Sequence, residues 1–271
     1  SEKYFNILLS KFYVPDNINF FLGQIDYKNK RYDEALLHYQ RIQQGTFVNV
    51  KTLNVSKALL KKYNLEKALS HIDKEIKIKN QDNLLNSLSL KLSIFEEIGE
   101  SADIIRLSSQ ILESFPNNER ALYSRALAYE KEGNILSMSK DFDEMIKLNK
   151  YNSIALNAYG YSLALHKLHL DKSEKLIRKA LDIRPGQAAI LDSLAWVLYL
   201  KGSYKEAAKY SSLAYSKDQD PEIIEHHYLI LLKNGNSNEA KSILDQSIKN
   251  NPNSEKLLKL LDSSENAAIK L

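Results

Sequence analysis

The sequence contains no cysteine, and this absence excludes several kinds of chemistry at once. Without a thiol the chain can form no disulfide framework, thiolate zinc site, iron–sulfur cluster or cysteine nucleophile. Glycine and proline are also scarce, with 8 and 5 among 271 residues, which is too few for the frequent tight turns of an all-β protein. No run of apolar residues reaches the length of about 18 that marks a membrane-spanning helix.

Neither sign of charge is in large excess. Lys and Arg number 38 against 34 Asp and Glu, which leaves a formal net charge of +4. A nucleic-acid-binding domain normally has clustered basic residues and a clearly basic isoelectric point, so the composition does not point to nucleic acid as a partner. Hydrophobic residues make up 44% and charged residues 27%, which predicts a folded chain with a core rather than a disordered one. The length allows one large or two ordinary domains.

Four of the five prolines follow one spacing along the chain. The intervals between Pro15, Pro116, Pro185 and Pro252 are 101, 69 and 67 residues, close to three, two and two periods of 34. The same period connects five small residues: Ala35, Ala68, Ser173, Ala207 and Ala240. Between Ala68 and Ser173, the corresponding positions hold two larger residues, Ile104 and Met138. A period of this length predicts a tandem array of small structural units.

Within each period, apolar residues recur every three or four positions, as in Ala188, Leu191, Leu194, Ala195 and Leu198. This spacing predicts two amphipathic helices in each period, and the alternating pattern of a β-strand is absent. Six glycines fit the same plan: two fall where helices must pass closely, Gly23 and Gly160, and four where a helix ends in a left-handed turn, Gly99, Gly133, Gly202 and Gly235. The chain is therefore expected to be all α-helical.

Two segments carry the pattern most clearly: residues 22–42, with Leu22, Gly23, Tyr32, Ala35 and Tyr39, and residues 193–215, with Leu194, Ala195, Gly202, Tyr204, Ala207 and Ala214. Both resemble the tetratricopeptide repeat, a helix-turn-helix unit of 34 residues. The resemblance implies a right-handed superhelical solenoid with repeats at about 16–48, 49–84, 85–118, 119–152, 153–187, 188–220 and 221–254. Three departures are expected: two extra residues near 80–83, Ile104 at a small-residue position, and one extra residue in the turn at 166–172.

The two ends of the array give different expectations. Residues 255–271 are amphipathic, with Leu257, Leu258, Leu260 and Leu261 on the apolar side, and are expected to form a helix that caps the last repeat. Residues 1–15 offer no such cap. Segment 3–14 precedes Pro15, and in the 34-residue period this is the place of the second helix of a repeat. We therefore expect it to be the remainder of a truncated repeat whose first helix lies upstream.

No residue set predicts catalysis. His166, His169 and Asp171 have the spacing of metal ligands, but they are expected in an exposed turn, and a metal site needs three or four converging ligands. His226 and His227 are expected to point to two sides of one helix. The motifs of serine hydrolases, zinc proteases and phosphate-binding loops are absent from the sequence. We therefore expect a protein that is not an enzyme and that needs no cofactor or metal.

The resemblance implies a concave groove lined by the first helix of each pair, with the second, fifth, ninth and twelfth residues of a repeat pointing into it. In the fourth to sixth repeats these positions include a row of aromatic and polar residues, Arg120, Tyr123, Asn157, Tyr161, Asp192, Trp196 and Tyr199. Such a row suits an extended peptide, because rings supply contact area at a small entropic cost and an amide can hydrogen-bond peptide groups. Tyr and Trp also pack between helices, so a core role is the alternative for each ring.

Some co-chaperones of this family hold a partner's terminal carboxylate with Lys, Asn and Arg at fixed positions of the first helices. The corresponding residues here include Phe20, Gln24, Leu53, Lys57, Ser89 and Ser93. This two-carboxylate clamp is therefore absent from the sequence.

Residues 156–253 resemble one group of the family, the long lipid-anchored tetratricopeptide-repeat proteins of proteobacterial envelopes. The similarity lies in the segments 157–161, 190–199 and 220–223. It implies a periplasmic, outer-membrane-anchored adaptor that holds a C-terminal processing protease or cell-wall hydrolases, with a lipidated cysteine upstream of residue 1. The alternatives are a cytoplasmic assembly or regulatory module of the same fold and a self-associating structural scaffold.

Overall fold

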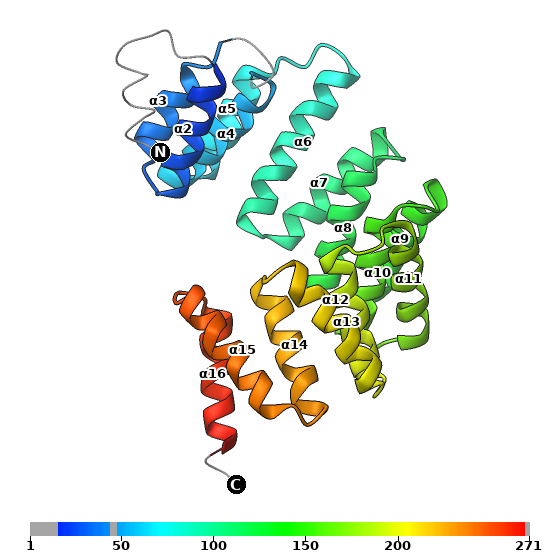
Figure 1. The fold of residues 1–271 in the computed structure, drawn as a ribbon. Helices are drawn as coiled ribbons and strands as arrows, with labels where there is room; N and C mark the ends of the chain where they lie inside the picture. The colour runs from blue at the N-terminus through cyan, green and yellow to red at the C-terminus, as the bar shows by residue number, and fades with distance from the viewer. Residues whose placement is uncertain (1–15, 44–47, 269–271) are drawn as a thin grey trace. The chain divides into compact units, whose positions relative to one another are not determined.

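A computed structural model describes residues 16–43 and 48–268, and within them every regular element is an α-helix. The fifteen helices of these residues follow one another along the chain (Figure 1). Their bounds are α2 (Asp16–Lys28), α3 (Tyr32–Gln40), α4 (Val48–Lys62), α5 (Leu65–Glu75), α6 (Gln81–Ile98), α7 (Ser101–Ser114), α8 (Glu119–Lys131), α9 (Ile135–Leu148), α10 (Ser153–Leu165), α11 (Leu170–Ile183), α12 (Ala188–Leu200), α13 (Tyr204–Lys217), α14 (Pro221–Lys233), α15 (Ser237–Asn250) and α16 (Glu255–Ala268). The expectation of an all-α chain is confirmed. The predicted helix at 3–14 lies outside the described residues.

The chain divides into two compact units, one up to Met138 and one from Ser139 on, so the boundary falls inside α9. In the first unit, one cluster of buried side chains lies around Tyr39 in α3, and another joins α6, α7 and α8. In the second unit, one cluster joins α10 to α14 and includes Ile177, Leu194 and Ala207. The right-handed superhelix stays a prediction.

Three of the predicted left-handed glycines lie in turns of identical length. Three residues separate α8 from α9, α12 from α13, and α14 from α15. The middle residues of these turns, Gly133, Gly202 and Gly235, have φ of 72°, 80° and 81°. Their sharp turns fold the second helix of each pair back along the first, as short connections between helices require. Gly99 ends α6 with φ of 82°.

The turn between α10 and α11 contains four residues, 166–169, so the extra residue expected in this repeat is present. Lys167 takes the place of the turn glycine: its N–H donates to the carbonyl of Ala164, just as that of Gly133 donates to Glu130. Lys167 and His169 both have positive φ, 54° and 46°. Because an L-residue is strained in this region, the turn stores a local cost that its neighbours avoid.

Lys167→Gly is expected to raise the free energy of unfolding by up to about 1 kcal/mol. Glycine adopts positive φ without strain, and its larger entropy in the unfolded chain offsets only part of that gain. Urea unfolding followed by circular dichroism measures the change. Lys175→Gly, in the interior of α11, is the matched control and should lower the free energy by about 1 kcal/mol. Destabilisation by both variants would contradict the strain assigned to Lys167.

Two glycines allow helices to pass closely, as the sequence predicts. A Cβ atom on Gly23 would lie 2.4 Å from the ring of Tyr39. One on Gly160 would lie 2.6 Å from the Ile177 side chain and 2.9 Å from the carbonyl oxygen of Ser173. The Ser173 hydroxyl also donates to the Gly160 carbonyl at 2.6 Å, which fastens α11 to α10. A larger residue at position 23 would therefore displace the Tyr39 ring, and one at position 160 would push α11 away from α10.

The second and third repeats differ from the expected plan. Asn80 caps α6 by accepting from the N–H of Asn83, so α6 begins at Gln81 and not at the predicted repeat boundary near 85. The extra residues near 80–83 thus lengthen a helix rather than a loop, because a good N-cap residue precedes them. Ile104 is buried in the cluster of α6, α7 and α8, so this large residue is accommodated at a small-residue position.

The last helix, α16, packs against the last repeat through leucines in its first two turns. Leu257 and Leu260 are buried against α14 and α15, whereas Leu258 is 39% exposed. This is the one-sided burial expected of a capping helix. Residues 269–271 of the predicted helix lie outside the described part of the chain. None of the helices described is both long and apolar enough to cross a lipid bilayer.

Candidate functional site

Five aromatic side chains of the second unit form a continuous series, here named the aromatic column: Tyr161, His226, Trp196, Tyr199 and Tyr204. The Trp196 ring stacks on the His226 imidazole, with centroids 4.1 Å apart, and on the Tyr199 ring at 5.0 Å. Tyr204 follows Tyr199 at 5.6 Å, and Tyr161 lies 6.2 Å from His226. Tyr161, Trp196 and Tyr199 are partly exposed, whereas His226 is buried. The column therefore lies partly at the surface and partly in the interior.

The repeat itself assembles the column. The helices α10, α12 and α14 are the first helices of successive pairs, and each contacts the next. Trp196 and Tyr199 are three residues apart on α12 and therefore share a face. Tyr161 comes from the helix before, His226 from the helix after, and Tyr204 from the first turn of α13. Rings distant in sequence thus meet because consecutive first helices lie side by side.

Under the rings, His226 pairs with Asp192, which precedes it by 34 residues, or one period. The imidazole Nδ1 lies 2.8 Å from Oδ2 of Asp192, and both side chains are buried. An ionised carboxylate only accepts hydrogen bonds, so Nδ1 carries the proton. Burial raises the pKa of Asp192 above its ordinary value, although the hydrogen bond from His226 opposes this. The other oxygen, Oδ1, is buried without a hydrogen-bond partner.

Because it is buried, Asp192 supports the column and does not itself form part of the binding surface. The sequence places its carboxylate in the groove, but only 5% of the residue is exposed, and one of its oxygens is held by His226. Asp192 therefore holds His226 in place beneath Trp196. Asn157, one period earlier, is partly buried, and its side-chain oxygen has no hydrogen-bond partner. The Tyr161 hydroxyl donates to Glu222 at 2.6 Å, and burial, followed by this bond, raises the pKa of Tyr161.

Arg120 and Tyr123 belong to the first unit. The Arg120 guanidinium is exposed and pairs with Glu96 at 2.9 Å and with the Ser93 hydroxyl at 2.5 Å. Tyr123 is partly buried and lines a cavity of about 420 Å³ between α6, α7 and α8. Its other lining residues include Ile104, Leu127 and Ala128, with Glu96 and Lys131 as charged groups. This cavity has the size and the mainly apolar wall of a pocket for one partner side chain.

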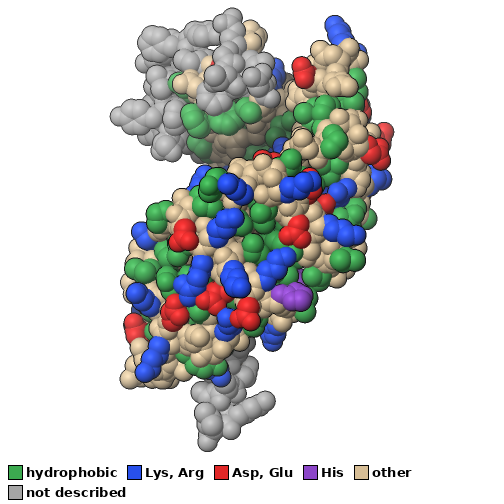
Figure 2. Space-filling model, turned by 90° about the vertical axis from the view of Figure 1, so that its right-hand side faces the viewer, with side chains coloured by type: hydrophobic (Ala, Val, Ile, Leu, Met, Phe, Trp, Pro, Cys, Tyr) green, Lys and Arg blue, Asp and Glu red, His purple; other side chains and the backbone are tan. Residues whose placement is uncertain are grey.

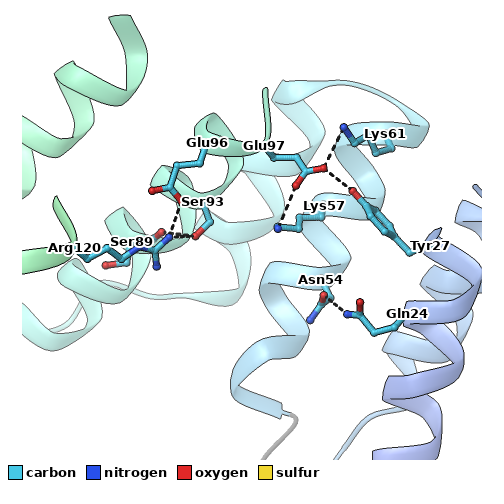
Figure 3. A network of polar contacts seen from close by, with 10 residues as sticks. All are labelled: Gln24, Tyr27, Asn54, Lys57, Lys61, Ser89, Ser93, Glu96, Glu97 and Arg120. Carbon is cyan, nitrogen blue, oxygen red and sulfur yellow. Dashed lines mark hydrogen bonds and ion pairs between the residues drawn. The ribbon is translucent and has the colours of Figure 1, made fainter. Parts of the chain in front are cut away.

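The first helices of the first unit carry a polar network (Figure 3). Glu97 of α6 lies at its centre: it accepts from the Tyr27 hydroxyl of α2 at 3.1 Å and pairs with Lys57 and Lys61 of α4 at 3.3 and 3.2 Å. Gln24 donates to Asn54 at 2.7 Å. Lys57, at a position that the carboxylate clamp uses in co-chaperones, is thus already neutralised by an internal carboxylate.

Glu97→Gln is expected to lower the free energy of unfolding by about 1 kcal/mol at pH 7, because two ammonium groups lose their partner. Burial raises the pKa of Glu97, but Lys61, Tyr27 and Lys57 together hold it below its ordinary value of 4.5. A lowered pKa means that the stabilisation is present above that ordinary value and is lost as the pH falls through the folded-state pKa.

Urea unfolding of the wild type and the variant at pH 7 and at about pH 3 measures this loss. The deficit should shrink at the lower pH. Glu113→Gln removes an exposed carboxylate of α7 for which the structure shows no ion pair, and it should have little effect at either pH. An equal deficit of Glu97→Gln at both pH values would show that its charge is not responsible.

Sequence reasoning missed His226 as part of the site. Its distance of one period from Asp192 and its place on a first helix were the available signals. His227 points to the other side of α14, where it hydrogen-bonds the Ser211 hydroxyl at 2.9 Å and stacks on Tyr215. Within the described residues no three His, Asp or Glu side chains converge as metal ligands, and this includes His166, His169 and Asp171.

Charges of both signs are mixed over the surface. On the face that Figure 2 shows, Lys and Arg side chains alternate with Asp and Glu, and neither sign forms a continuous field. Several charged groups of the second unit are paired, as in Arg178 with Glu174 and Glu206, and Lys201 with Asp171. This pattern gives local rather than long-range electrostatic selectivity.

Comparison with known proteins supports the repeat. A sequence model of the tetratricopeptide repeat matches residues 229–254. The chain is 26% identical over 211 residues to the TPR repeat-containing protein PA4667 of Pseudomonas aeruginosa, covering 78% of this chain and 36% of that protein. It therefore spans about a third of that relative's length.

Solved structures show the same fold at low sequence identity. A tetratricopeptide-repeat protein of Parabacteroides merdae aligns with a TM-score of 0.64 at 16% identity, over 91% of this chain and 97% of that one. The type IV pilus biogenesis factor PilW aligns with a TM-score of 0.63 at 16% identity, over 80% of this chain and all of its own. With its helical pairs, period and turn glycines, the chain has the fold of the tetratricopeptide-repeat proteins.

Proposed function

We propose that this protein is a non-catalytic scaffold and that the aromatic column is the surface on which it binds a partner protein or an extended peptide. The tetratricopeptide-repeat fold itself suggests a scaffold for protein–protein interaction. The observation that carries the proposal is the stack of Trp196 on His226 and Tyr199, which holds partly exposed rings rigidly across adjacent first helices. Rings fixed in this way lose little entropy when a partner covers them.

We further propose that the partner belongs to the bacterial envelope, with a C-terminal processing protease or cell-wall hydrolases as the candidates. The support is the resemblance of segments 157–161, 190–199 and 220–223 to lipid-anchored envelope adaptors. Attachment to the outer membrane through an upstream lipid belongs to the same proposal. A cytoplasmic module and a self-associating scaffold are the competing functions.

The test is affinity capture from separate envelope and cytoplasmic fractions of the source cell, with the full-length protein as bait. The proposal expects specific partners from the envelope fraction and their loss when the bait carries Tyr161→Ala with Tyr199→Ala. Lys209→Ala, on the second helix α13, is the matched surface control. Partners found only in the cytoplasmic fraction would favour the cytoplasmic module. Capture that is unchanged by the two tyrosine replacements would disprove the column as the binding surface.

A further inference from the structure

We propose that the cavity between α6, α7 and α8 is a second binding site of the scaffold and receives a tyrosine side chain of a partner protein. The cavity lies wholly in the first unit and shares no residue with the aromatic column. Its volume is about 420 Å³, and its wall includes Ile104, Leu127, Ala128 and the Tyr123 ring. Two observations support a tyrosine as the occupant: the place of the cavity in the repeat, and the polar groups of its wall.

Two repeats place a pair of tyrosine rings where their two helices join. Tyr32 is the first residue of α3, and Tyr27 lies five residues before it, near the end of α2; their ring centroids are 5.7 Å apart. Tyr204 and Tyr199 take the same two places in α13 and α12, with centroids 5.6 Å apart. The same contact thus recurs at one place of the repeat, because equivalent helices give equivalent positions similar surroundings.

In the third repeat the cavity lies at this place. Glu96 of α6 and Ser101, the first residue of α7, stand where the other two repeats have tyrosines, and both line the cavity. The register is the same in all three repeats, since a residue with positive φ stands two places before the second helix begins: Lys30, Gly99 and Gly202. The cavity therefore corresponds in position to the rings that the third repeat lacks.

This vacancy distinguishes the third repeat from the rest of the described chain. Each of the other six helix pairs has a tyrosine, leucine or isoleucine in at least one of the two places, whereas Glu96 and Ser101 are both polar and Ser101 is small. The space left beside Ile104 and Leu127 is mostly apolar. An aromatic side chain that enters it removes apolar surface from water on both partners.

Glu96 and Lys131 supply an acceptor and a donor for a hydroxyl group. Glu96 accepts from the Ser124 hydroxyl at 2.6 Å and from Arg120 at 2.9 Å, and Figure 3 shows the second of these contacts. A carboxylate has about four acceptor sites, so Glu96 can accept a further hydrogen bond. The Lys131 ammonium donates to the Gly99 carbonyl at 2.6 Å, and an ammonium has three hydrogens to donate.

The chain already holds one of its own tyrosine hydroxyls between these two kinds of group. Lys172 donates to the Tyr159 hydroxyl at 2.7 Å, and this hydroxyl donates to Asp143 at 3.5 Å. Tyr27 likewise donates to Glu97 at 3.1 Å. A partner's tyrosine in the cavity would have an apolar wall for its ring and a carboxylate and an ammonium for its hydroxyl. Phenylalanine would use the apolar wall alone.

Methyl groups in the cavity wall report directly on a ring that enters. Ile104, Leu127 and Ala128 carry such groups, and their NMR signals shift when an aromatic ring lies against them. The probes are capped peptides of the sequence Gly-Ser-X-Ser-Gly, in which X is tyrosine, phenylalanine, leucine or alanine. Each peptide is titrated into the methyl-labelled full chain. The methyl groups of Ala240 and Leu257, buried in the second unit, provide reference signals.

The expected result is a saturable shift of the three cavity methyls with the tyrosine peptide, about fivefold weaker binding of the phenylalanine peptide, and no saturable shift with alanine. Lys131→Met removes one partner of the hydroxyl and should reduce the preference for tyrosine over phenylalanine. Ser101→Tyr places a ring of the chain itself in the cavity and should weaken binding of the tyrosine peptide at least tenfold. Ser237→Tyr, the same replacement at the first residue of α15, is the matched control and should leave binding unchanged.

Absence of shifts at the cavity methyls, or equal affinity for the tyrosine and phenylalanine or leucine peptides, would overturn the inference. Unchanged binding to a folded Ser101→Tyr variant would also overturn it. If this variant does not fold, the comparison of the tyrosine and phenylalanine peptides on the wild type still decides. Failure of the proposed function looks different: there, partner capture would not depend on Tyr161 and Tyr199, which take no part in the cavity experiment.

Discussion

His226→Leu is expected to lower the free energy of unfolding by about 3 kcal/mol. The replacement preserves most of the volume under Trp196 but removes the hydrogen bond to Asp192, whose two oxygens would then both be buried without a donor. An unpaired buried carboxylate is among the most destabilising groups in a protein interior. Urea unfolding at pH 7, followed by circular dichroism at 222 nm, measures the change.

Two further variants separate the charge from the packing. His227→Leu is the matched control, because this neighbouring histidine is equally buried but its partner is the neutral Ser211 hydroxyl, so its cost should be about 1 kcal/mol. Adding Asp192→Leu to His226→Leu should recover much of the loss, since the stranded charge is gone. A cost of His226→Leu no larger than that of His227→Leu would mean that the carboxylate is not the cause.

Trp196→Ala is expected to weaken binding of the captured partner by about 2 kcal/mol or more, which corresponds to roughly thirtyfold in the dissociation constant. Trp196 is the central ring of the column, with His226 on one side and Tyr199 on the other, so its loss separates the remaining rings. Interface energy commonly concentrates in such rigid aromatic residues. Isothermal titration calorimetry with the purified partner gives the affinity.

Folding must be measured beside affinity, because Trp196 also packs against the buried cluster of α10 to α14. Tyr199→Ala provides a second test at the more peripheral part of the column, and Lys209→Ala should change affinity by only a few tenths of a kcal/mol. If Trp196→Ala and Tyr199→Ala both fold like the wild type and keep full affinity, the partner binds elsewhere on the chain.

Much of the fold could be predicted from local pattern. Gly23 and Gly160 were expected at close helix passes, and each has a side chain within 3 Å of where its Cβ would be. The four turn glycines have positive φ, and the extra residue of the α10–α11 turn is present. The structure starts α6 at Gln81, before the repeat boundary expected near 85, because Asn80 caps a longer helix that the repeat length alone does not reveal.

The sequence by itself determined the period, the helical pairs and the first-helix positions of Tyr161, Trp196 and Tyr199, because these follow from spacing within one or two turns of a helix. Only the tertiary structure decided that Asp192 is buried, that His226 completes the column and that Glu97 neutralises Lys57. These contacts join residues on different helices. Spacing along the chain fixes which face a residue lies on, whereas the packing of one helix against the next decides which side chains meet there and which of them water still reaches.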